Sequence, residues 1–155
     1  MVVGVGASAG GLEAFTELLS HLPGDTGMAY VLIQHLDPSH ESHLTELLSK
    51  ASKMPIAEVQ GETRVEANHV YVIPPRRNLG ISDGVIHTSA RPDSGRNMPI
   101  DSFLRALAAE GGSKALGVIL SGTASDGTLG LQAIKAAGGI TFAQEMRTEI
   151  GRAHV

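Results

Sequence analysis

The chain has 155 residues, the size of one ordinary globular domain. Hydrophobic residues make up 42% and charged residues 18%, a composition that excludes an intrinsically disordered chain. The formal net charge is -4 with no long basic run, so nucleic-acid binding is disfavoured. Because there is no cysteine, disulfides, a cysteine nucleophile and thiolate-bound metals are excluded.

The first third of the chain alternates short apolar runs with segments of helical period. Residues 2–5 and 28–34 read as strands, and residues 12–22 and 44–52 read as helices. The run Tyr-Val-Leu-Ile at 30–33 is continuously apolar, as expected for a parallel strand that is covered on both faces. We therefore expect helices on both sides of a parallel sheet.

The pattern changes between residues 56 and 88. Apolar runs at 56–59 and 70–73 are followed by two short runs around Ser82-Asp83-Gly84, which is a hairpin signal. This stretch predicts an antiparallel insertion. A polar loop at 91–98 then precedes a helix at about 100–109, which we expect Asp101 or Ser102 to cap.

The strand and helix alternation resumes near the carboxyl end. We expect a buried strand at 116–120, a helix at 127–137 ended by Gly138-Gly139, and a strand at 140–143. The predicted fold class is α/β, a doubly wound, mostly parallel sheet flanked by helices, with an antiparallel hairpin insertion. Neither a signal peptide nor a membrane span is visible, and a cytoplasmic location follows by default.

Glycine is the compositional outlier, at 19 residues or about 12% against a usual share of about 7%, and it is dense in the first turn. Gly4-x-Gly6-x-x-Ala9 fits a loose dinucleotide-binding fingerprint. The same stretch read as Gly6-x-Ser8-x-Gly10 fits a nucleophile elbow. Ser8 is equally suited to cap the following helix. This motif alone leaves the three interpretations open.

Two further polar residues follow predicted strands. His35 comes after the second strand, where a dinucleotide site would need an acidic residue, and Asp126 follows the strand at 116–120. Asp126 is also a preferred residue for a helix N-cap, a role that is compatible with catalysis. Because Ser8, His35 and Asp126 share the carboxyl edge of the predicted sheet, they suggest a triad for acyl transfer. Backbone N–H groups near Ala9 and Thr123 would stabilise the oxyanion.

Four spaced motifs give the chain a family resemblance. They are Gly6-Ala7-Ser8-x-Gly10-Gly11, Gln34-His35, Val70-Tyr71-Val72-Ile73-Pro74-Pro75 and Leu120-Ser121-Gly122-x-x-x-Asp126-Gly127. In this order they resemble the catalytic domain of the chemotaxis protein-glutamate methylesterase (CheB-type) family along nearly the whole chain. The resemblance implies that Ser8, His35 and Asp126 form the family's triad, which needs no cofactor and no metal. It also implies hydrolysis of glutamyl methyl esters on the signalling helices of chemoreceptors, with glutamine deamidation as a second activity.

Some positions depart from the family pattern. Ala9 stands where threonine is frequent, and Gly122-Thr123-Ala124 replaces a common Gly-Met-Gly. These departures keep open a receptor-binding domain without catalysis, and the turn at 4–11 keeps open a nucleotide-binding module. The chain looks more like the variants that are fused to methyltransferase and sensory domains than like the two-domain response regulator.

Two other features bear on the domain and its ligands. A metal site of His35, His40, His43 and Asp37 is disfavoured, because clustered histidines often mislead and the helix near Ser39 accounts for them. The codons for residues 150–155 can resemble a sequencing adapter. We therefore expect a catalytic domain at 1–147, cut short at its carboxyl end, and a non-native tail at 148–155.

Overall fold

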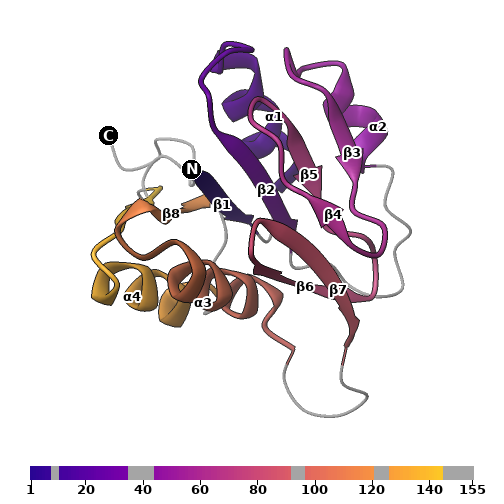
Figure 1. Ribbon diagram of the computed structural model, residues 1–155. Helices are drawn as coiled ribbons and strands as arrows, with labels where there is room; N and C mark the ends of the chain where they lie inside the picture. The colour runs from indigo at the N-terminus through magenta and orange to yellow at the C-terminus, as the bar shows by residue number, and fades with distance from the viewer. Residues whose placement is uncertain (8–10, 35–43, 92–96, 121–125, 145–155) are drawn as a thin grey trace, which may run out of the picture.

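The computed structural model describes residues 1–7, 11–34, 44–91, 97–120 and 126–144 (Figure 1). The first elements are β1 (Val2–Ala7), α1 (Gly11–His21), β2 (Ala29–Gln34), α2 (Leu44–Ser49), β3 (Ile56–Glu58), β4 (Thr63–Arg64) and β5 (Val70–Val72). They are followed by β6 (Arg77–Ser82), β7 (Val85–Ala90), α3 (Pro99–Gly111), a 3-10 turn η1 (Gly112–Lys114), β8 (Leu116–Leu120), α4 (Thr128–Ala136) and β9 (Ile140–Ala143). The tail expected at 148–155 lies outside these ranges.

A six-stranded sheet forms the centre of the molecule. Its order is β3-β5-β2-β1-β8-β9, and every neighbouring pair is parallel. The chain starts at β1, adds β2 beside it, forms β3 at the edge and then returns with β5 between β3 and β2, and it later adds β8 and β9 on the other side of β1. This is the doubly wound parallel sheet that the alternation of apolar runs and helical segments predicted.

Helices cover both faces of the sheet. Successive residues of a strand point to opposite faces, and Val3 and Val5 belong to a buried cluster with Phe15 and Leu19 of α1. The other face carries a second buried cluster, in which α3 and α4 pack against the sheet. Figure 1 shows α3 and α4 side by side, well away from α1 and α2. In the described ranges, no helix has the length and apolar character that a membrane crossing requires.

Two glycines of β1 let α3 lie close to the sheet. A Cβ atom built on Gly4 would come within 2.6 Å of Leu104 Cδ2, and one built on Gly6 would come within 2.5 Å of Ile100 Cγ2. Both distances are far below carbon–carbon contact, so a side chain at either position would push the helix outward. The start of α3 is therefore held directly over β1.

The antiparallel insertion is a separate sheet of three strands, in the order β4-β7-β6. The expected hairpin joins β6 to β7, and its two turn residues have positive φ, 52° at Asp83 and 73° at Gly84, as a tight hairpin requires. The insertion contains fewer of the strands between residues 56 and 88 than the sequence pattern suggested. β3 and β5 belong to the parallel sheet instead, because β5 is buried at every residue and pairs with β2. The two residues of β4 carry no sequence pattern and were not expected.

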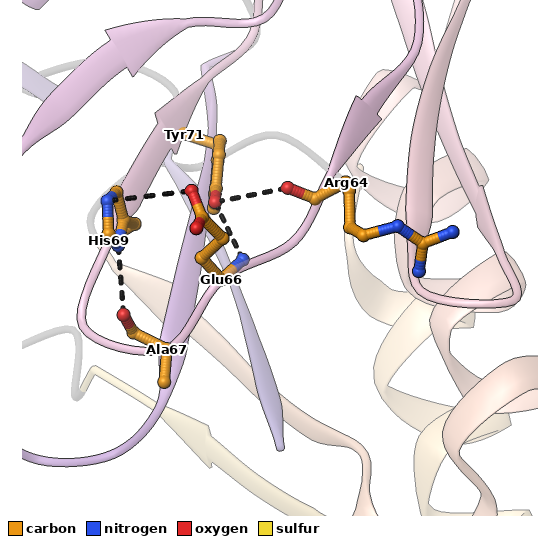
Figure 2. Close-up of polar contacts among 5 residues, drawn as sticks. All are labelled: Arg64, Glu66, Ala67, His69 and Tyr71. Carbon is orange, nitrogen blue, oxygen red and sulfur yellow. Dashed lines mark hydrogen bonds and ion pairs between the residues drawn. The ribbon is translucent and has the colours of Figure 1, made fainter.

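A polar network fixes the connection between β4 and β5 (Figure 2). The hydroxyl of Tyr71 accepts a hydrogen bond from the Glu66 N–H at 2.8 Å and donates to the Arg64 carbonyl at 3.4 Å. His69 lies beside them, with its Nδ1 2.9 Å from the carbonyl oxygen of Ala67. His69 precedes β5 and lies at the amino edge of the sheet, so its contacts serve the fold.

Replacing Tyr71 with phenylalanine should lower the free energy of unfolding by about 1 kcal/mol, because the part-buried N–H of Glu66 loses its acceptor. Urea titration measures this. Tyr30→Phe is the matched control: its hydroxyl donates to the Thr26 hydroxyl, so no backbone group is left unpaired and the loss should be smaller. An equal loss in the two variants would contradict the role of Tyr71.

The same phenol predicts a pH dependence of stability. Burial raises the pKa of Tyr71, the Glu66 N–H opposes the rise and the Glu66 carboxylate adds to it. Because the pKa is higher in the folded state, this stabilising contribution is complete below about pH 10 and is lost as the pH rises further. Wild-type unfolding free energy should therefore fall above about pH 10 more steeply than that of Tyr71→Phe. Parallel profiles would contradict the prediction.

Candidate active site

Three neighbouring strands end together at the carboxyl edge of the parallel sheet. Ala7, the last residue of β1, is the register partner of Gln34, the last residue of β2. Ala7 is also the register partner of Leu120, the last residue of β8. The chain therefore leaves β1, β2 and β8 at one place, and in open α/β sheets this is the edge where ligands bind.

The three segments that follow β1, β2 and β8 carry the predicted site residues. Ser8 and His35 are the next residues in sequence after β1 and β2. Both lie outside the described residues, as do Ala9 and Thr123, so their roles stay predictions. Asp126 is described, and it anchors the site that can be built from the structure.

Asp126 is buried, with 5% of its surface exposed, and its carboxylate is held by the start of α3. Oδ2 accepts a hydrogen bond from the Ile100 N–H at 3.0 Å, and Oδ1 accepts one from the Asp101 N–H at 2.8 Å. Helix N-termini favour negative charge, because their first amides have no partner within the helix. Each carboxylate oxygen has two acceptor positions, so these two bonds are compatible with a third to an imidazole.

Asp126 does not cap the helix that follows it. The N-cap of α4 is Gly127, which has φ of 112° and makes no side-chain cap hydrogen bond. The carboxylate instead reaches across to α3, 25 residues away in sequence. An aspartate before a helix suggests a local cap, but here the two carboxylate oxygens accept hydrogen bonds from the buried amides of α3.

Asp101, in turn, caps the helix that follows Asp126. Its Oδ1 accepts hydrogen bonds from the N–H of Gly127 at 2.9 Å and from the N–H of Gly130 at 2.7 Å, at the start of α4. We call these two sets of hydrogen bonds the reciprocal caps: the carboxylate of Asp126 caps the start of α3, and the carboxylate of Asp101 caps the start of α4. Asp101 is 4% exposed, so both carboxylates are buried.

The reciprocal caps correct the expectation that Asp101 or Ser102 caps its own helix. The N-cap of α3 is Met98, which makes no side-chain cap hydrogen bond, and Pro99 follows as the first helical residue. Proline has no N–H at this position, so the first two amides that need an acceptor belong to Ile100 and Asp101. Asp126 supplies the acceptor for both, which leaves the Asp101 side chain for α4.

Arg91, which follows β7, interacts electrostatically with Asp126. Its Nε donates to the Arg77 carbonyl at 3.3 Å. Burial lowers the pKa of the Arg91 guanidinium, and the negative charge of Asp126 counters that effect. The sequence placed Arg91 in a polar surface loop and gave no sign of this link, because the two residues are far apart in the chain.

A surface cavity of about 530 Å³ opens beside the reciprocal caps. Its lining comes from the chain entering α3, from the first two turns of α3 and from the first turn of α4: Met98, Asp101, Ser102, Arg105 and Leu129. Leu129 is 54% exposed although it is apolar. The mixture of apolar and charged side chains suits a peptide surface better than a small apolar ligand.

The dinucleotide interpretation loses its first two glycines. Gly4 and Gly6 lie inside β1, paired with β2 and β8, where they make room for α3. A dinucleotide fingerprint needs such glycines in the turn, where backbone amides approach a pyrophosphate. Among the described residues, no group of three or more histidines, cysteines and acidic residues can hold a metal ion. The cluster at 35–43 lies outside the described residues.

Comparison with known proteins points to one family. A family model described as CheB methylesterase matches residues 3–150. The chain is 36% identical over 146 residues to a protein-glutamate methylesterase/protein-glutamine glutaminase of Burkholderia pseudomallei, a match that covers 91% of this chain and 40% of that protein. The chain thus spans about two fifths of the length of this relative.

Two further relatives differ in kind. An uncharacterized 104.1 kDa protein of Rhodobacter capsulatus is 38% identical over 104 residues, which is 67% of this chain and 11% of that protein. Among solved structures, the catalytic domain of Thermotoga maritima CheB methylesterase superposes with a TM-score of 0.83 at 27% sequence identity. That superposition covers 95% of this chain and 80% of the other.

Removing the Asp126 carboxylate should destabilise the chain. In Asp126→Ala the buried amides of Ile100 and Asp101 lose their acceptors, and we expect the free energy of unfolding to fall by about 2–4 kcal/mol. Denaturant titration monitored by circular dichroism measures the change. Asp25→Ala, at an exposed aspartate, is the control and should stay within about 0.5 kcal/mol of wild type. A stable Asp126→Ala would show that α3 does not depend on this carboxylate.

Proposed function

The chain belongs to the CheB methylesterase family, and from this premise we propose that it is a serine esterase that hydrolyses glutamyl methyl esters on chemoreceptors. The observation that carries the proposal is the buried Asp126 carboxylate at the edge where β1, β2 and β8 end together. We include glutamine deamidation as a second activity, since the Burkholderia pseudomallei relative is named for both reactions.

The described residues support a triad at this edge. Ala7 and Gln34 are register partners, and the proposed nucleophile Ser8 and base His35 each follow one of them by a single residue. Asp126 follows β8 after a short segment, and β8 pairs with β1. In this proposal all three side chains come from the ends of adjacent strands.

The proposed chemistry follows the serine, histidine and aspartate template. Ser8 Oγ attacks the ester carbonyl while His35 takes the serine proton, and His35 then returns the proton to the departing methanol. Water hydrolyses the acyl-enzyme by the same route and releases a glutamate side chain. Asp126 holds the imidazole and stabilises its charged form, and it can do so because α3 fixes its carboxylate.

Oxyanion stabilisation is assigned to two backbone N–H groups, those of Ala9 and Thr123. Both residues lie in segments between a strand and a helix, where amides without helical partners favour developing negative charge. Because a backbone donor does not depend on its side chain, the family departures at these two positions are compatible with catalysis. A glutamine side chain fits the same scheme, with ammonia as the leaving group in place of methanol.

The proposal extends to partners and location. We infer that the substrate is the methylated signalling helix of a chemoreceptor, and that the reaction takes place in the cytoplasm, where such helices are exposed. We also infer that this domain works in a larger protein with methyltransferase and sensory domains. The 104.1 kDa relative from Rhodobacter capsulatus supports this inference, because the matched region is only 11% of its length.

The test is methanol release from a methylated receptor fragment. Ser8→Ala should lower kcat at least about a thousandfold, because no other group replaces the nucleophile. Ser89→Ala, at an exposed serine on β7, is the matched control and should keep wild-type turnover. Unchanged turnover in Ser8→Ala would refute Ser8 as the nucleophile. A wild-type chain that binds the fragment without releasing methanol would show a receptor-binding domain instead.

A further inference from the structure

We propose that Asp101 is a positioning residue for catalysis: it fixes Asp126 in place by holding the backbone on the carboxyl side of that residue. The proposal rests on the proposed function, in which Asp126 orients the catalytic histidine. No contact of Asp101 with substrate is involved. Asp101 acts through Gly127, because its Oδ1 accepts a hydrogen bond from the Gly127 N–H at 2.9 Å.

The geometry joins the two aspartates in a closed loop of contacts. The Asp126 carboxylate accepts the N–H of Asp101, and the Asp101 carboxylate accepts the N–H of Gly127, the residue bonded to Asp126. Any displacement of Asp126 therefore strains a bond at both ends. A single cap would hold only the side chain, whereas this loop holds the side chain and the backbone together.

The loop depends on the absence of a side chain at Gly130. A Cβ atom built there would lie 2.6 Å from Leu104 Cβ and 3.3 Å from Asp101 Cα. Because α4 can approach α3 this closely, the short side chain of Asp101 reaches the Gly130 N–H at 2.7 Å. The second bond locks the Asp101 carboxylate in the orientation that Gly127 needs.

The environment of Asp101 argues against a purely stabilising role. Its Oδ2 is buried and has no hydrogen-bond partner among the described residues. A buried carboxylate oxygen without a partner is unfavourable, and buried unpaired polar atoms are rare enough in native structures to require an explanation. The explanation we propose is that Oδ1 must lie at the backbone beside Asp126. An unfavourable local feature, here the unpaired Oδ2, is tolerated where the geometry is needed for a functional site.

The experiment compares three substitutions at this position in the 155-residue chain, with methanol release from a methylated receptor fragment as the readout. Asp101→Asn keeps an acceptor at Oδ1 and removes the charge. Asp101→Glu keeps the charge but moves the acceptor by one methylene group. Asp101→Ala removes the acceptor altogether. Circular dichroism first establishes which variants are folded at the assay temperature.

We expect kcat to fall about tenfold to a hundredfold in Asp101→Glu and Asp101→Ala, with KM within about twofold of wild type, because misplacing a catalytic group slows the chemical step. Asp101→Asn should keep kcat within about threefold. Met54→Ala is the matched control: Met54 is buried before β3, at the amino edge of the sheet, so its loss of stability should leave kcat unchanged.

Two results would overturn the proposal. The first is a folded Asp101→Ala or Asp101→Glu with kcat within about twofold of wild type. The second is a tenfold fall in folded Asp101→Asn, which alone is decisive if the other two variants do not fold. In both results the wild-type chain is active, so the proposed function survives. A wild-type chain that releases no methanol marks the failure of the esterase itself, and the positioning role fails with it.

Discussion

The close packing of α3 against β1 is the constraint on which the site depends. Gly4 and Gly6 expose bare backbone toward this helix, and Leu104 and Ile100 occupy the space that their side chains would fill. A sheet face normally presents side chains to its covering helix and so keeps it at a distance. Here the first turn of α3 comes near the carboxyl edge of the central strand, and its free amides arrive where a buried carboxylate can accept them.

Electrostatics follow from this packing. Two buried carboxylates near each other would repel in a medium of low dielectric constant. In this chain each lies at a helix N-terminus, where partial positive charge and free N–H groups offset the repulsion. The guanidinium of Arg91 adds a full positive charge within the range of Asp126. The carboxylate that would orient the proposed base His35 is thus held in a buried position by the start of α3.

The fold was predictable because its signals are local. The continuous apolar run at 30–33 marked β2 as a buried parallel strand, and Asp83 with Gly84 marked the hairpin. β5 was expected in the antiparallel insertion and lies in the parallel sheet instead, because its pairing with β2 depends on residues far away in the chain. The predicted capping pattern was wrong for a physical reason: the free amides of α3 find their acceptor in Asp126 rather than in a neighbouring residue, and the partner of each aspartate lies about 25 residues away. Sequence periodicity carries no information about such contacts. Ser8 and His35 stay predictions, supported by the strand ends that precede them.

The reciprocal caps also bear on how this sequence can change over time. A substitution of Asp101 or Asp126 by a residue without a side-chain acceptor leaves two buried amides unpaired at the start of the other helix. Because the two residues are in direct contact, we expect the effects of substitutions at the two positions on stability to be non-additive. Substitutions at Gly130 bear on the same contacts, since any larger residue there would separate the helices. We expect amino-acid substitutions to be rare at these three positions and frequent on the exposed faces of the same helices.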